Sequence, residues 1–417
     1  MHYTGSQNWV HHNFTVENVS NGVPDGPASL VFAGTDKMYY IANDGYIHGY
    51  IKVNGDYNGG TWLTVSPSYA CQFSASFTVK AKSDLVASPD GTTLLYIGTD
   101  GYIHGFSIVD VWTYEYFDFM KYSATNPQQS MMTQGITADS CLIYPADDRI
   151  YYIGTYSYGA VYVQGFQKSS TPGTWLTISP TIQAAASLPI DLQYTPAGGL
   201  TYDLNSTPNR LYYRATSGYL AYFEVIDTIT YNYNDCAYAN GALTAQQLRI
   251  TGNLAIYNNG IETRIYYIGQ YIGGTVPEGQ YWIHCLINNG SSWSTVSPSY
   301  SALYSGQPMY GAPVGTVQQS RPSMLGQIAV SPDGLTVAYI SDYLFVCFYY
   351  SSDGINYFFY SIPFSNLNDV MGDNSLQFRG FDLFYASYWD NHTVHHYKYQ
   401  EDYCINPSIQ ELNNYNP

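Results

Sequence analysis

The chain has 417 residues, 31 acidic against 14 basic side chains, and a formal net charge of −17 at pH 7. This balance argues against a nucleic-acid partner, which needs a basic surface, and against electrostatic attraction to anionic lipid. No apolar run approaches the ~20 residues that span a bilayer, so we predict no membrane span. The 47 tyrosines, frequent glycine and few charges are typical of β-strands joined by tight turns.

A short hairpin sequence recurs along the chain. The segment Asp44-Gly45-Tyr46-Ile47-His48-Gly49 returns 56 residues later as Asp100-Gly101-Tyr102-Ile103-His104-Gly105. Its Asp-Gly pair suits a tight hairpin turn, because glycine accepts a positive φ. Seven copies can be aligned, with first strands at residues 38–41, 94–97, 150–153, 211–214, 265–268, 337–340 and 382–385. Repetition at this interval predicts a repeat architecture.

Each hairpin has recognisable neighbours. An apolar strand and a Ser-Pro-Asp-Gly turn, at residues 88–91 and 331–334, precede two of the copies. An alternating strand that contains Trp and stops at Pro follows three others, at residues 61–67, 174–180 and 292–298, with a looser copy at 111–114. Proline suits an outer edge strand. The sequence therefore predicts an all-β fold, a seven-bladed β-propeller of four-stranded antiparallel blades, forming one domain over residues 1–417.

The two ends of the chain predict how the ring closes. The seventh hairpin is followed by residues 399–417, a C-terminal tail without a Trp strand, whereas residues 7–14 resemble such a strand. We expect residues 7–16 to complete the last blade, which hides two sheet edges. Trp9 is then expected at the place that Trp62, Trp175 and Trp293 hold in their own blades. If Trp9 is fully buried there, replacing it by Ala costs about 3–5 kcal/mol.

Polar residues recur at one place in the hairpins. This place holds His48, His104, Gln164, His284 and His395. Because strand residues alternate between faces, these side chains point away from the Ile or Val before them in the His copies. Two interpretations remain open: they line ligand-binding clefts between blades, together with Trp62, Trp175 and Trp293, or they bond to a neighbouring blade as part of the framework.

The histidines at the two ends are a candidate metal site. If the N-terminal strand pairs with the last blade, His11 and His12 lie beside His395 and His396. Imidazoles on one face, ~4.5–5.5 Å apart at Cβ, can share a metal ion; exposed strand positions are the alternative interpretation. No other cofactor is predicted. Acidic residues fall mostly in turns, and no Gly-Xaa-Ser-Xaa-Gly motif is present, so we predict a protein that is not an enzyme.

Six cysteines without a CxxC spacing favour neither a zinc nor a redox motif. We predict one local disulfide, Cys236–Cys285, with Cys71–Cys404 as the second choice and Cys141 and Cys347 as buried thiols. Residues 1–6 do not have the features of a signal peptide. Five sequons are compatible with a secreted, extracellular protein and give the glycosylation candidates Asn13, Asn18, Asn205, Asn289 and Asn391.

The hairpin followed by Trp62 resembles the repeats of propeller lectins of the fungal fucose-lectin and tectonin kind. The resemblance implies a carbohydrate-binding propeller. In the fucose lectins a Glu after the turn helps to hold the sugar, but that position falls at Gly49 and Gly105 here, so fucose specificity is not implied. We predict a secreted, non-catalytic, lectin-like protein that binds glycans through aromatic and amide side chains. The alternative is a structural subunit that binds copies of itself in an extracellular lattice or filament.

Overall fold

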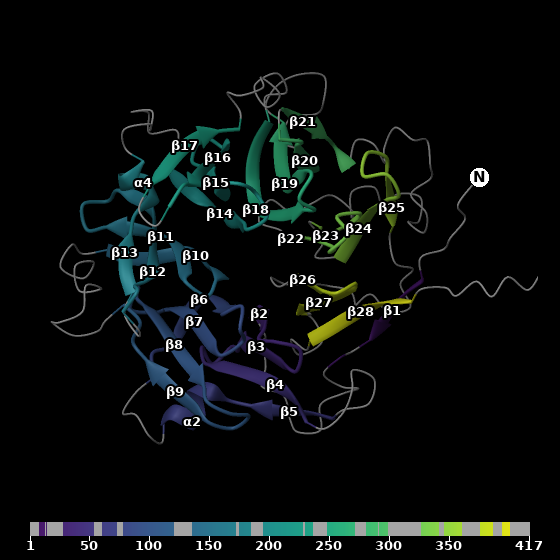
Figure 1. The fold of residues 1–417 in the computed structure, drawn as a ribbon. Helices are drawn as coiled ribbons and strands as arrows, with labels where there is room; N and C mark the ends of the chain where they lie inside the picture. Colours follow the sequence, from purple (N-terminus) through teal and green to yellow (C-terminus); the bar gives the residue numbers. More distant parts are fainter. Residues whose placement is uncertain are drawn as a thin grey trace, which may run out of the picture.

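The computed structural model describes residues 8–12, 14, 28–53, 61–72, 78–120, 136–171, 175–184, 195–227, 230–236, 248–271, 281–290, 292–298, 327–341, 346–360, 376–386 and 394–400. The chain forms seven four-stranded antiparallel sheets that stand around a ring (Figure 1). The predicted seven-bladed all-β propeller is therefore confirmed. Each aligned hairpin supplies the second and third strands of one blade, and an outer strand follows it in blades 1 to 6.

The blades are numbered here in chain order. The strands of blades 1 to 4 are β2 (Ala28–Phe32), β3 (Lys37–Ile41), β4 (Ile47–Val53) and β5 (Thr61–Val65); β6 (Ala81–Ala87), β7 (Thr93–Gly98), β8 (Ile103–Ile108) and β9 (Tyr114–Phe117); β10 (Ile136–Ala146), β11 (Arg149–Tyr156), β12 (Val161–Lys168) and β13 (Trp175–Ile178); β14 (Pro196–Asp203), β15 (Asn209–Ala215), β16 (Leu220–Val225) and β17 (Tyr231–Asp235). The strands of blades 5 to 7 are β18 (Leu248–Asn258), β19 (Thr263–Tyr271), β20 (Tyr281–Asn288) and β21 (Trp293–Val296); β22 (Ile328–Val330), β23 (Thr336–Ile340), β24 (Val346–Ser351) and β25 (Tyr357–Tyr360); β26 (Gln377–Arg379), β27 (Asp382–Ala386), β28 (Val394–Gln400) and β1 (Asn8–His12).

The N-terminal strand closes the ring, as the sequence predicts. Strand β1 pairs antiparallel with β28 and completes blade 7 (Figure 1). Trp9 lies opposite Tyr399, four residues beyond the His395 position of the hairpin. Trp62 has the same register, because it lies opposite Lys52, four residues beyond His48. Residues 399 and 400 of the predicted tail belong to β28, and the rest of the tail lies outside the described residues.

An aromatic residue is the first or second residue of the outer strand in every blade. The register places at this position Trp9, Trp62, Tyr114, Trp175, Tyr231, Trp293 and Tyr357. One expectation was wrong: residues 111–114 are not an outer strand, because β9 begins only at Tyr114. The carboxylate of Asp110 accepts hydrogen bonds from the backbone N–H groups of Trp112 and Thr113, which makes this segment a turn.

The three tyrosines at this position connect neighbouring blades by hydrogen bonds, whereas the side chain of Trp9 lies outside the described residues. Three hydroxyl pairs cross a blade boundary: Tyr39 with Tyr114 at 3.2 Å, Tyr151 with Tyr231 at 3.2 Å, and Tyr266 with Tyr357 at 2.9 Å. Burial is the main cause that raises the pKa of the outer-strand tyrosine in each pair to about 12. The hydroxyls therefore stay neutral and can donate. The pairs join blades 1 to 2, 3 to 4 and 5 to 6, which accounts for part of the high tyrosine content.

Two short helices follow outer strands. Helix α2 (Pro67–Gln72) follows β5, and α4 (Pro180–Gln183) follows β13. In each, the Pro that ends the outer strand opens a helical turn, where its missing N–H is not needed. No helix in the described part of the chain is long and apolar enough to cross a membrane.

The antiparallel order gives the ring two different faces. Within each blade, the turn after the first strand and the turn after the third strand must leave on the same side. We call this side the turn face. The described turns on it comprise residues 33–36, 88–92, 109–113, 147–148, 169–171, 204–208, 226–227, 230, 259–262, 289–290, 292, 331–335, 352–356 and 380–381. The opposite face carries the repeated Asp-Gly turns and the connections between blades.

Candidate functional site

The recurring polar residues of the hairpins lie inside the blades. His48, His104, Gln164, His284 and His395 are at most 2% exposed. Each lies directly across the hairpin from a tyrosine, and four of the five pairs bring the two rings into contact. A ligand cannot touch these side chains without opening the blade. This geometry favours the interpretation that these residues belong to the framework. The hydrogen bonds of His48 and His104 are made within their own blade, however, and not to a neighbouring blade as that interpretation expected.

His48 and His104 are tied to the aspartates of their own turns. His104 Nε2 is 2.9 Å from Asp100 Oδ1 and its Nδ1 is 2.8 Å from Asp118 Oδ1. His48 Nε2 is 3.1 Å from Asp44 Oδ2. Asp44 and Asp100 also accept the backbone N–H two residues further on. The Asp of the repeated Asp-Gly turn therefore both stabilises the turn and bonds to the buried histidine.

Asp44, His48 and Ser66 form a chain with the composition of a catalytic triad. Ser66 Oγ is 2.5 Å from His48 Nδ1. Burial is the main influence that lowers the pKa of His48, which favours the neutral imidazole. In that form Nδ1 can accept a hydrogen bond from the Ser66 hydroxyl while Nε2–H donates one to Asp44. However, the same Ser-Pro sequence follows the outer strand of blade 5, where Ser297 Oγ donates to the backbone carbonyl of Ile283. We therefore interpret Ser66 as part of the framework.

The buried state of His284 gives a prediction about pH. Burial lowers the pKa of His284 from 6.5 to about 3, so the folded protein keeps this imidazole neutral while the unfolded chain binds a proton below pH 6.5. Stability that is present above pH 6.5 is consequently lost as the pH falls towards 3. At pH 5, about 1.5 units below the unfolded pKa, this loss amounts to about 2 kcal/mol at ~1.4 kcal/mol per unit.

The variant His284→Gln tests this expectation, since Gln164 holds the equivalent place in blade 3. Urea unfolding at pH 7 and pH 5 is expected to show a smaller loss of stability in the variant than in the wild type. An equal loss in both proteins would show that His284 is protonated in the folded state or does not control the acid sensitivity.

Glycine follows the recurring polar residue in blades 1 to 3. A Cβ atom added to Gly49 would lie 2.5 Å from the Met38 carbonyl oxygen, and one added to Gly105 would lie 2.7 Å from that of Leu94. The strands therefore approach too closely for any side chain. These two positions correspond to the sugar-holding Glu of the fucose lectins, so the departure from that family follows from how this blade packs.

The outer-strand tryptophans pack between blades. Trp62 is 8% exposed and its ring lies 5.0 Å from that of Phe14. Trp175 and Trp293 are half-buried, with neighbouring rings Phe119 and Tyr222 at 5.4 Å and 6.1 Å between centroids. All three lie in blade-to-blade packing, and whether the half-buried pair also contacts a ligand stays a prediction.

The metal site predicted between the histidines of β1 and β28 stays a prediction, because the structure describes the side chains of His395 and His396 but not those of His11 and His12. His12 lies opposite His396 on the backbone, and His11 lies opposite Tyr397; the side chains of both lie outside the described residues. The His395 ring stacks on Tyr385, whereas the His396 ring contacts Phe14 and Phe384. The two therefore point to opposite sides of β28. No group of three or more His, Cys, Asp or Glu side chains that could hold a metal occurs among the described residues.

The predicted disulfide between Cys236 and Cys285 is wrong, because both are free thiols. Cys236 packs in the cluster between blades 4 and 5, with Leu286 of blade 5. Cys285 packs in the cluster between blades 5 and 6. The sheet of blade 5 separates the two sulfur atoms, because Cys285 and Leu286 point to opposite faces.

The remaining cysteines and the sequons are placed as follows. Cys71 is a buried free thiol whose Sγ contacts the Tyr114 carbonyl oxygen at 3.1 Å, and Cys404 lies outside the described residues. Cys347 is buried as expected, whereas Cys141 is half-buried. Asn205 and Asn289 are exposed in turns, and the other three sequons, at Asn13, Asn18 and Asn391, lie outside the described residues. Glycosylation therefore stays a prediction.

Several turns of the turn face expose large apolar side chains, a feature that the sequence analysis missed. The exposed side chains there are Val109, Val111, Trp112, Leu204, Ile226, Ile261, Ile355 and Phe381. They come from blades 2, 4, 5, 6 and 7. The described Asp-Gly and Ser-Gly turns of the opposite face, in blades 1, 2 and 4, have small or polar residues at their tips, and Tyr158 in blade 3 is the exception.

Three of these side chains belong to turns with the same hydrogen bond, and we call each such turn an anchor turn. An Asp or Asn accepts the backbone N–H of the exposed apolar residue two positions later. The pairs are Asp110 with Trp112 at 2.7 Å, Asn259 with Ile261 at 2.9 Å and Asp353 with Ile355 at 2.9 Å. The signal in the sequence is an Asp or Asn two residues before a large apolar residue at a turn. It was missed because apolar residues are normally assigned to the core.

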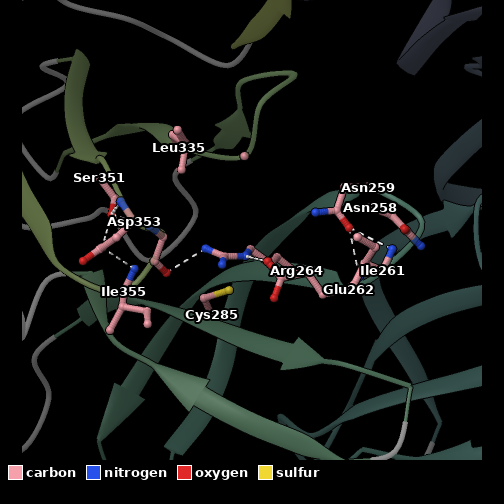
Figure 2. A network of polar contacts seen from close by, with 12 residues as sticks. Asn258, Asn259, Ile261, Glu262, Arg264, Cys285, Leu335, Ser351, Asp353 and Ile355 are labelled. Atoms are coloured by element: carbon pink, nitrogen blue, oxygen red, sulfur yellow. Dashed lines mark hydrogen bonds and ion pairs between the residues drawn. The ribbon is translucent and has the colours of Figure 1, made fainter.

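The anchor turns of blades 5 and 6 are joined by a buried arginine. Arg264 is 7% exposed and its Nη1 donates to the Gly354 carbonyl oxygen at 2.7 Å, while Nε bonds to Glu262 at 2.6 Å. Figure 2 shows Arg264 between the turn that carries Ile261 and the turn that carries Ile355. On the other side of blade 5, Asn205 Nδ2 donates to the Asn258 carbonyl oxygen. The turns of blades 4, 5 and 6 are thus linked to one another.

Comparisons with known proteins give neither a family nor a function for this chain. The sequence matches no protein-family model and no curated protein. Among solved structures, the chain is similar to the WD40 β-propeller domain of Doa1, with 12% identity and a TM-score of 0.46 over 92% of this chain and 95% of that chain. It is also similar to BamB from Moraxella catarrhalis, with 12% identity and a TM-score of 0.41 over 90% of this chain and 82% of that chain.

Proposed function

We propose that this propeller is a binding protein that docks a partner protein on its turn face. The observation that carries the proposal is the set of exposed apolar side chains at the turns of that face. Trp112, Ile261 and Ile355 are 56%, 82% and 58% exposed, although each is held by an anchor turn. Apolar groups gathered on one surface of a soluble protein mark interaction sites, whereas single scattered ones need no explanation.

The rigidity of the turn face also supports docking. The anchor turns fix the backbone of each apolar residue, and Arg264 joins two of these turns across a blade boundary. A surface that is ordered before binding loses less conformational entropy when the partner arrives. Large apolar and aromatic side chains at the centre of an interface contribute most of its binding energy.

Glycan binding at six of the eight residues expected from the sequence is less well supported. The five recurring polar side chains are at most 2% exposed, and Trp62 is 8% exposed. A sugar stacks on an accessible aromatic face, which these residues do not offer. Glycan binding elsewhere and self-association therefore enter as competing outcomes of the experiment.

The experiment compares three forms of the protein for retention of partners from its native source. The first is the wild type; the second carries Trp112→Ser, Ile261→Ser and Ile355→Ser. The third is a control with Tyr158→Ser and Ile182→Ser, which are exposed on the opposite face. We expect a protein that binds the wild type and the control but binds the second form at least ten-fold more weakly, about 1.4 kcal/mol.

The candidate partner is then purified and titrated, and hydrogen exchange is measured with and without it. Protection at residues 109–113, 259–262 and 353–356 supports the proposal. Equal retention by all three forms contradicts it. Elution by free sugar indicates glycan binding, and a mass that grows with concentration in light scattering indicates self-association; either result replaces the proposed function.

A further inference from the structure

The turn face carries negative charge beside its apolar side chains. Its exposed acidic residues are Asp36, Asp90, Asp110, Asp147, Asp148, Asp227, Asp333 and Asp353. The described turns of this face contain no Lys or Arg. Lys168, at the end of β12, is exposed beside them, and the cations that flank the turns, Lys37, Arg149, Arg210 and Arg379, are half-buried. A partner for this surface therefore needs positive charge as well as apolar groups.

The charges and the apolar groups lie next to each other in the anchor turns. Asp110 and Asp353 are two residues before Trp112 and Ile355, and their carboxylates accept the backbone N–H of those residues. Hydrogen bonds from the backbone, led by those of Trp112 and Asn356, lower the pKa of both carboxyl groups. The carboxylates consequently stay ionised at neutral and mildly acidic pH.

The boundary between blades 5 and 6 combines these features most densely. Ile261 and Ile355 stand on turns that Arg264 holds together (Figure 2). Asp353 supplies an exposed carboxylate, whereas the Glu262 carboxylate is paired with Arg264. The guanidinium of Arg264 is already engaged with Glu262 and Gly354 and is buried. It therefore does not present its charge to a partner.

We propose that the turns 259–262 and 353–356 form a docking site for a positively charged amphipathic segment of a partner protein. Aliphatic side chains of the segment contact Ile261 and Ile355, and its Lys or Arg side chains lie against Asp353 and the other carboxylates. Charge complementarity selects this occupant, because a second copy of a chain with net charge −17 and an anionic lipid surface are both repelled. This inference rests on the proposed function and names the chemistry of the partner.

The test uses three synthetic peptides with the whole protein. One alternates lysine with leucine in an amphipathic pattern; the second keeps the lysines and replaces leucine by serine; the third keeps the leucines and replaces lysine by glutamate. Fluorescence anisotropy is expected to show saturable binding of the lysine–leucine peptide only. If the lysine–serine peptide binds as tightly as the lysine–leucine peptide, the contact is purely electrostatic. If the glutamate–leucine peptide binds as tightly, the contact is purely apolar. Either result, or no binding of any peptide, overturns the inference.

Variants locate the site. Ile261→Ser with Ile355→Ser is expected to weaken the lysine–leucine peptide at least ten-fold, and these side chains are too exposed for the change to unfold the protein. Asp353→Asn removes one charge while its amide oxygen can still accept hydrogen bonds from the N–H groups of the turn. We expect this variant to lose less affinity for the lysine–leucine peptide than the Ile pair does, and its binding to depend less on salt than that of the wild type. Tyr158→Ser, on the opposite face, is the control, and a loss there equal to that of the Ile pair overturns the site.

The two proposals fail separately. If the Trp112→Ser, Ile261→Ser and Ile355→Ser variant (the turn-face variant) loses its native partner but the lysine–leucine peptide does not bind the wild type, docking on the turn face stands. The basic amphipathic partner is then rejected. If the peptide binds at residues 261 and 355 but retention of the native partner is unchanged in the turn-face variant, the proposed function is rejected.

Discussion

Removal of residues 1–16 is expected to lower the free energy of unfolding by several kcal/mol and to make the protein aggregate. The deletion removes β1, whose five residues pair with β28, and leaves β28 as an open sheet edge. It also removes Phe14, which is 4% exposed and packs against Tyr50, Trp62 and Phe384 between blades 7 and 1. The ring would then lack both its last strand and the aromatic side chain at its closure.

The single variant Phe14→Ala isolates the packing contribution and is expected to cost about 3–5 kcal/mol. Phe358→Ala is the matched control, because Phe358 is 41% exposed on the outer strand β25 and its loss is expected to cost well under half as much. Thermal unfolding and light scattering of the three proteins provide the measurement. A shortened chain that melts with the wild type and stays monomeric would show that β1 does not hold the ring closed.

The variant Gly105→Ala is expected to destabilise the protein at the upper end of the ~1–3 kcal/mol found for overpacked cores. The added Cβ would lie 2.7 Å from the Leu94 carbonyl oxygen and 2.6 Å from the Phe117 ring. Backbone on one side cannot move without breaking the ladder between β7 and β8. Ser107→Ala, two residues along the same strand, is the control and is expected to change stability little.

The variant Gly105→Glu places the sugar-holding acid of the fucose lectins at its corresponding position. We expect it not to fold, because it adds a buried charge to the same steric conflict. Urea unfolding of Gly105→Ala and the soluble yield of Gly105→Glu decide the matter. If both variants fold with the stability of the wild type, the close approach of the strands is not required, and a lectin-type site in this blade becomes sterically feasible.

The amino-acid sequence by itself determined the architecture. The repeated Asp-Gly hairpin and the Trp-to-Pro strand specify local geometry through turn chemistry and alternation, and these depend on residues close together in the chain. The spare Trp strand at residues 7–14 and the missing one after residue 398 were sufficient to predict the pairing of β1 with β28. Local signals of this kind do not require knowledge of any distant contact.

The tertiary structure decided everything that depends on which blade faces which. Tyr114, Tyr231 and Tyr357 occupy the tryptophan position of their blades, but only the register reveals this, because the turns before them differ in length from the turns before the tryptophans. Cys236 and Cys285 are close along the ring, yet a sheet lies between them. The recurring histidines looked like candidate ligands in the sequence, and their burial became visible only when the opposing tyrosines were placed across the hairpin. The exposure of Ile261 and Ile355 was equally hidden. The sequence alone does not assign an apolar turn residue to one face of the ring, because that face exists only when the blades are assembled.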